Sequence, residues 1–122
     1  MIKGFRDLNV WNKAHKLVVD ILKTEFNFPC DDRFGLATQL RRAAISVPAN
    51  ISEGCERYYT KEKLQFFNIA RGSLSETRYY LLLCRDLGYL DEESYNSFDA
   101  DCEEIFRMLG GLITSLKSSD NS

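Results

Sequence analysis

A group of basic and aromatic residues offers the clearest binding chemistry in this sequence. Arginine and lysine can contact phosphates, and tyrosine can stack on unpaired bases. The group comprises Arg41, Arg42, Arg57, Tyr58, Tyr59, Lys61 and Lys63. These residue types predict a surface for RNA or single-stranded DNA. The pI of about 5.4 argues against this assignment, because nucleic-acid-binding domains are usually basic.

A second group of polar residues recurs with helical spacing. Arg42, Ser46, Asn50 and Glu53 follow one another at steps of four, four and three, so they share one face of a helix. This face is a solvated surface, a polar network within the chain, or a contact with another subunit. Glu76 belongs with this group, because a carboxylate among apolar neighbours needs a partner. We expect Arg42 or Arg41 to pair with Glu76, within the bundle or across a subunit boundary.

Catalytic constellations are missing from the sequence. His15 is the single histidine, so a site with several histidine ligands cannot form within one chain. No Glu-x-x-His motif, glycine-rich phosphate loop or dinucleotide fingerprint occurs. The sequence therefore predicts neither an enzyme nor a protein with a metal or cofactor.

Length and composition are those of an ordinary globular domain. The chain has 122 residues, of which 44% are hydrophobic and 28% charged, with a formal net charge of −2. No apolar run is long enough to span a membrane, and the N-terminus lacks the features of a signal peptide. We expect a cytoplasmic protein with free thiols, with Cys84 and Cys102 in the core. Residues 1–89 carry a surplus of basic residues, and residues 90–122 a surplus of acidic ones.

Four amphipathic segments must position these side chains. In each segment, apolar residues recur at steps of three and four, which is typical of a helix with one buried face. The second stripe is Ala37, Leu40, Ala44, Val47 and Ile51, and the third is Phe67, Ala70, Leu74, Thr77, Leu81 and Cys84. The first stripe is Leu8, Trp11, Ala14, Val18 and Ile21, and the fourth is Tyr95, Phe98, Cys102, Ile105, Leu109, Leu112 and Leu116.

Short connections between these segments predict an all-α fold, an antiparallel up-down-up-down four-helix bundle. We expect it to occupy residues 1–117, with a disordered tail at residues 118–122. Pro48 removes one backbone hydrogen bond within the second helix, so we expect a kink near Val47–Pro48. Gly54 suits a left-handed helix end, and Gly88 ends the third helix.

Three motifs resemble one known family of bacterial proteins. The opening KGFRDLNVWNKAHKLV is similar to the F-x-D-L-x-V-W-x-x-A start of the four-helix-bundle proteins encoded in 23S rRNA intervening sequences. RFGLATQLRRAAISVPANISEG resembles the central signature of that family, and GSLSETRYYLLLCRDLGYL resembles its third-helix signature. The resemblance extends from Phe5 to about Leu116.

The resemblance implies a four-helix bundle that assembles as a homopentamer, in a family whose molecular role is not established. It also implies a distant relation to the accessory variability determinant of diversity-generating retroelements, which binds nucleic acid and reverse transcriptase. Two hypotheses follow for this chain: a non-enzymatic oligomeric scaffold, or an accessory protein that binds RNA or single-stranded DNA. The scaffold is favoured by the extra apolar residues of the third helix, which include Phe66, Ile69, Tyr80 and Leu83.

Overall fold

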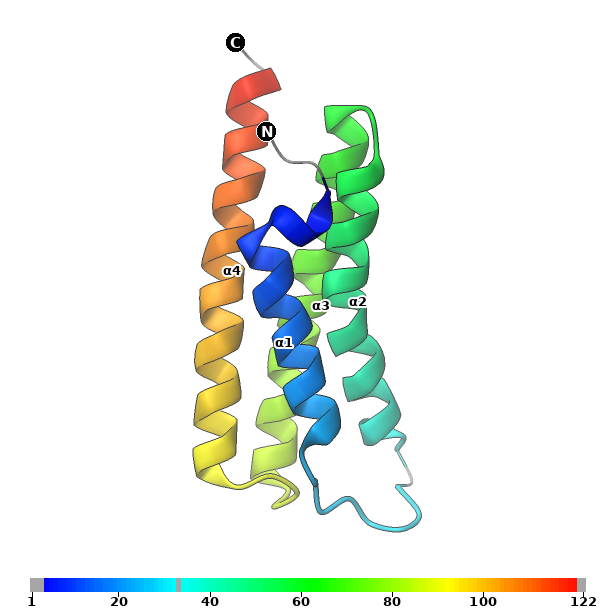
Figure 1. Cartoon of the computed structure of the whole chain (residues 1–122). Helices are drawn as coiled ribbons and strands as arrows, with labels where there is room; N and C mark the ends of the chain where they lie inside the picture. The colour runs from blue at the N-terminus through cyan, green and yellow to red at the C-terminus, as the bar shows by residue number, and fades with distance from the viewer. Residues whose placement is uncertain (1–3, 33, 121–122) are drawn as a thin grey trace.

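The chain folds as a bundle of four long helices. The computed structural model describes residues 4–32 and 34–120. A short 3-10 helix, η1 (Phe5–Asp7), precedes α1 (Asn9–Lys23), α2 (Leu36–Glu56), α3 (Thr60–Asp86) and α4 (Glu92–Asp120). Figure 1 shows the helices side by side, each running opposite to the one before it. The predicted all-α four-helix bundle is confirmed.

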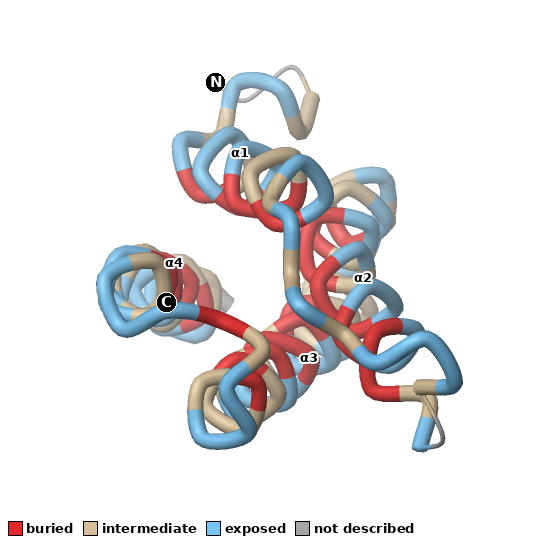
Figure 2. Tube along the Cα trace, turned by 90° about the horizontal axis from the view of Figure 1, so that it is seen from below, coloured by how far each residue is buried: buried red, intermediate tan, exposed pale blue. Residues whose placement is uncertain are grey.

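The core fills the centre of the bundle, where every helix buries one stripe (Figure 2). The predicted stripes of α2 and α3 are buried in full. In α1, Val10 and Leu17 are buried, whereas Trp11 is half-buried, as is Leu8 just before the helix. In α4 the buried stripe ends at Ile113. Every residue of the stripes predicted from the 3-4 spacing is therefore buried in α2 and α3, although these helices also bury residues outside the stripes, whereas the stripes of α1 and α4 are buried only in part.

The connections at one end of the bundle are held by side-chain and backbone hydrogen bonds. The Asp32 carboxylate accepts hydrogen bonds from the backbone N–H groups of Leu36 and Ala37, each at 3.1 Å. These bonds satisfy donors that the first turn of α2 leaves free. Between α3 and α4, Gly88 adopts a φ of 79°, a left-handed conformation that glycine tolerates without strain. Asp91 then caps α4 by accepting the N–H of Ser94 at 2.7 Å.

The interior of α2 differs from one expectation. Gly54 lies inside the helix, two residues before its end at Glu56, and not at a left-handed terminus. A Cβ atom at this position would lie 2.6 Å from Cε1 of the buried Phe67 ring. Glycine is therefore needed for the close approach of α3. Pro48 is buried within a continuous α2, and a kink there remains a prediction.

Helix α4 extends further than expected. It continues to Asp120, so residues 118–120 are helical and do not form the predicted tail. Residues 121–122 lie outside the described residues. The sequence SLKSSD at this end contains neither the glycine nor the proline that commonly ends a helix.

Candidate functional site

The outer surface between α2 and α3 gathers most of the polar group found in the sequence. Ser46 on α2 and Ser73 on α3 share a hydrogen bond of 2.9 Å between their hydroxyl oxygens. Asn50 donates to the Ser46 hydroxyl and to its carbonyl, both at 2.8 Å. About two turns away, the Tyr80 hydroxyl donates to Oε1 of Gln39 at 3.1 Å. These bonds fix the register of the two helices along one line.

Two adjoining hollows lie along this line, and both include Gln39 and Tyr80. The first has a volume of about 490 Å³. It is mostly apolar and is lined by Pro29, Asp31, Asp32, Phe34, Leu36, Gln39, Tyr80, Leu83, Leu87 and Tyr89. The second has a volume of about 480 Å³ and is mostly polar, with Arg42, Ala43, Ser46, Ser73 and Glu76 beside the shared pair. We call the two hollows together the α2–α3 groove.

The expected ion pair between Glu76 and an arginine does not form within the chain. Glu76, Arg41 and Arg42 are all exposed. Although Arg42 and Glu76 line the same hollow, neither makes an ion pair with any described residue. Because Glu76 is solvated, it is not the buried carboxylate that the sequence indicated. A pair across a subunit boundary remains a prediction.

Glu53, the last member of the polar group, pairs with Arg57 one turn along α2, at 2.6 Å. The Arg57 guanidinium also lies over the ring of Phe66, 4.7 Å from its centroid. Lys63 donates to the backbone carbonyl of Cys55 at 3.1 Å, near the end of α2. Two members of the predicted nucleic-acid surface, Arg57 and Lys63, thus hold the connection between α2 and α3.

The remaining predicted nucleic-acid residues fall into two separate places. Tyr58 and Tyr59 lie at the α2–α3 turn, 86% and 64% exposed, with their rings edge to face. Lys61 is exposed beside them. Arg42 lies fifteen residues before Arg57, which corresponds to about 22 Å along a helix. The seven residues therefore do not form a single surface patch. The compact part of the predicted nucleic-acid surface is the α2–α3 turn with Tyr58, Tyr59 and Lys61.

An ion pair between α3 and α4 was not predicted from the sequence. Arg78 donates to both carboxylate oxygens of Asp99, from Nε at 3.0 Å and from Nη2 at 3.2 Å. This hydrogen bond raises the pKa of Arg78 above its ordinary value. Asp99 is half-buried. The sequence feature that could have pointed to this ion pair was the position of Arg78, which directly follows the core residue Thr77.

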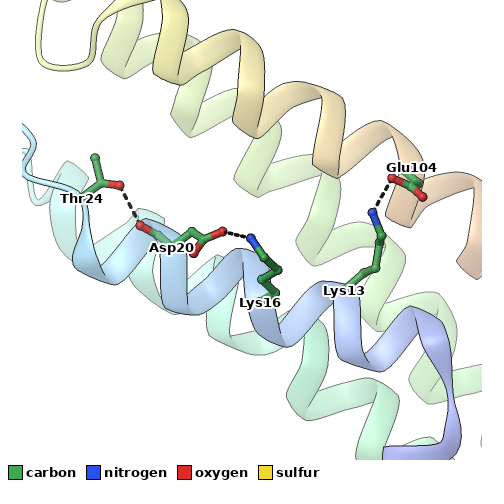
Figure 3. A network of polar contacts seen from close by, with 5 residues as sticks. All are labelled: Lys13, Lys16, Asp20, Thr24 and Glu104. Atoms are coloured by element: carbon green, nitrogen blue, oxygen red, sulfur yellow. Dashed lines mark hydrogen bonds and ion pairs between the residues drawn. The ribbon is translucent and has the colours of Figure 1, made fainter.

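A smaller polar network follows the side of α1 (Figure 3). Lys13 reaches Glu104 on α4 at 2.6 Å, and Lys16 pairs with Asp20 at 2.7 Å. The Thr24 hydroxyl donates to the carbonyl of Asp20 at 2.7 Å, which satisfies an acceptor at the end of α1. Both ion pairs are solvent-exposed, and such pairs contribute little to stability. Within this network only the Lys13–Glu104 pair joins α1 to α4, and the network does not resemble a reactive site.

Groups that could act as nucleophiles or metal ligands are dispersed. Within residues 4–32 and 34–120, no three His, Cys, Asp or Glu residues are placed to hold a metal ion. His15 is exposed and stacks on Trp11, with ring centroids 5.0 Å apart. Burial raises the pKa of the Cys84 thiol to about 11 and that of Cys102 to about 12, so both thiols stay protonated. These two cysteines are core residues, as expected.

No helix within residues 4–32 and 34–120 is both long enough and apolar enough to cross a membrane.

Comparisons with known proteins bear on this arrangement. A solved structure from Bacteroides thetaiotaomicron VPI-5482, described as a protein with unknown function from the S23 ribosomal protein family, is 28% identical to the chain. The match has a TM-score of 0.76 and covers 85% of this chain and 97% of that one. No curated protein matches. The model of the 23S rRNA-intervening sequence protein family matches residues 6–111, which include all of α1, α2 and α3 and most of α4. The chain therefore belongs to the 23S rRNA-intervening sequence protein family.

Proposed function

We propose that this protein is a non-enzymatic scaffold that assembles with copies of itself, as the homopentamer implied by the family resemblance. The observation that carries the proposal is the apolar outer surface of α3. Ile69, Tyr79 and Leu87 are 47%, 57% and 51% exposed, and Phe34 beside the groove is 82% exposed. These exposed apolar side chains are spread along α3 and the ends of its neighbouring connections, and a second copy that covered them would remove apolar surface from water.

Self-association is tested by measuring the molar mass in solution. Size-exclusion chromatography with light scattering, across tens of micromolar chain, should give five times the 14.1 kDa mass of one chain. Analytical ultracentrifugation would then show whether the assembly is closed or grows with concentration. A protein that stays at 14.1 kDa throughout this range contradicts the scaffold proposal.

A second function is favoured by a different observation, the exposed pair Tyr58 and Tyr59 at the α2–α3 turn. Two exposed rings beside the exposed Lys61 offer a stacking surface and a cation for single-stranded RNA or DNA. Glu56 and Glu62 on the same turn weaken attraction to phosphate, and so we rank this function second.

Fluorescence anisotropy with labelled single-stranded RNA, single-stranded DNA and a structured RNA tests this second function. Binding should weaken as salt rises, because phosphate contacts release counterions. Replacing Tyr58 and Tyr59 with alanine should abolish binding, whereas Arg41→Ala should leave it unchanged, since Arg41 lies far along α2 from the turn. If none of the three probes binds at low salt, the nucleic-acid function is excluded.

A further inference from the structure

The polar end of the α2–α3 groove carries two charges of opposite sign that lack ion-pair partners among the described residues. Arg42 and Glu76 line the same hollow. A phosphate backbone would be attracted by Arg42 and repelled by Glu76, so the hollow is poorly suited to nucleic acid. A protein surface that carries one acidic and one basic side chain would satisfy both residues.

The other end of the groove is apolar, and it determines what else a partner surface must present. Leu83 and Leu87 face the apolar hollow together with Tyr80, which joins the two hollows. A partner that fits the whole groove therefore presents a large apolar side chain next to an acid and a base. The apolar group supplies most of the contact energy, and the charges set the orientation.

Helix α4 of this same chain presents such a combination. Phe106 is 37% exposed, and Glu103 and Arg107 flank it within one turn. Glu103 and Arg107 form an ion pair of 3.2 Å, but their side chains are 57% and 68% exposed. An exposed pair of this kind is worth little, so both residues can exchange partners at small cost. Among the described residues, a Cβ built at Gly111, one turn further on, has no neighbour within 4 Å, so a helix of another copy can approach there.

We propose that the α2–α3 groove of one copy receives the α4 surface of a second copy. Glu103 of α4 pairs with Arg42, Arg107 pairs with Glu76, and Phe106 packs against Tyr80 at the junction of the hollows. This contact rests on the proposed self-assembly and identifies the two surfaces that carry it.

The two surfaces are different parts of one bundle. Figure 2 shows α4 on the far side of the bundle from α2, with α1 and α3 between them. A contact between unlike surfaces is head-to-tail, and head-to-tail contacts form rings when the rotation closes. The proposed contact is therefore compatible with a ring of five copies, whereas a two-fold contact would not be.

Charge reversal tests the contact with light scattering as the readout. Arg42→Glu places Glu against Glu103 of the next copy, and Glu103→Arg places Arg against Arg42. Each single variant should raise the concentration at which the assembly half-dissociates by about tenfold or more, because like charges then meet. The double variant restores opposite signs and should recover most of the loss. Circular dichroism would show that each variant keeps its helices, as expected for exposed positions.

Arg41→Glu is the matched control, since it makes the same charge change one residue away, outside the groove. It should assemble like the parent protein. If the parent assembles and Arg42→Glu assembles equally well, the groove is not the contact, although the scaffold proposal stands. If Arg42→Glu dissociates and the double variant does not recover, the α4 partner is wrong. A monomeric parent protein overturns the scaffold proposal together with this contact.

Discussion

Replacing Gly54 with alanine tests the packing of α2 on α3. A Cβ at this position would lie 2.6 Å from Cε1 and 2.9 Å from Cδ1 of the Phe67 ring. Both distances are far shorter than a van der Waals contact. Phe67 is only 2% exposed and packs in the core, so its ring cannot swing into solvent. The two helices must move apart, or the ring must leave its preferred rotamer.

Two opposing effects set the size of the change. Alanine is favoured over glycine inside a helix by about 1 kcal/mol. Overpacking a dense core costs about 1–3 kcal/mol. At Gly54 both effects act, so we expect a net loss of up to about 2 kcal/mol in the free energy of unfolding. At Gly72, inside α3, an added Cβ has nothing within 4 Å outside its own helix. Gly72→Ala should therefore stabilise the protein by about 1 kcal/mol.

Urea denaturation followed by circular dichroism would measure both variants. All samples need the same chain concentration, because self-association shifts the apparent stability. The Phe67→Leu change supplies a further check: it makes room, so Gly54→Ala should cost less in that background than in the parent protein. The reasoning would be refuted by a Gly54→Ala protein stabilised as much as Gly72→Ala, since the close contact would then carry no cost.

Three further predictions follow from the polar and thiol groups. Asp99→Asn should lower the free energy of unfolding by about 1–2 kcal/mol, because Arg78 loses charge-assisted hydrogen bonds at a half-buried position; replacing both residues by apolar ones should cost less in the same urea assay. Asp32→Ala should cost about 0.5–2 kcal/mol through loss of the α2 cap, and Asp32→Asn less, which thermal denaturation can measure. The free energy of unfolding should fall as the pH rises above 9.0, the ordinary thiol pKa, towards about 11, because Cys84 and Cys102 ionise in the unfolded chain while they stay protonated in the fold. Replacing both cysteines with alanine should flatten this fall of the free energy of unfolding with pH. An unchanged fall would contradict its assignment to the two thiols.

The sequence by itself determined the helices and most of their buried faces. Along α2 and α3, apolar residues recur at every third or fourth position, and a helix brings such residues onto one side. This periodicity belongs to each segment alone, so the buried face can be predicted without knowing which helices pack against it. The same holds for Gly88, whose place after the last apolar residues of α3 indicates a left-handed helix end. Burial of Cys84 and Cys102 followed from the same periodicity.

The candidate site was only partly determined in this way. Periodicity grouped Ser46 and Asn50 correctly, because residues four apart on a helix are neighbours. It could not identify Ser73 as their partner across the groove, or show that Arg42 and Glu76 remain apart. Those contacts depend on the register of α3 relative to α2. The spacing of residues along the sequence contains no information about that register.

Tertiary structure alone decided which residues meet between helices. The sequence indicated that Gly54 ends a helix. In the fold it lies inside α2, where the missing side chain leaves room for the Phe67 ring. Arg57 and Lys63 have the composition of a phosphate-binding surface, but the turn brings carboxylate and carbonyl oxygens within their reach. The side chain of a long cation can reach several partners, and the choice among them is made by the register and separation of packed helices, which the whole core sets together.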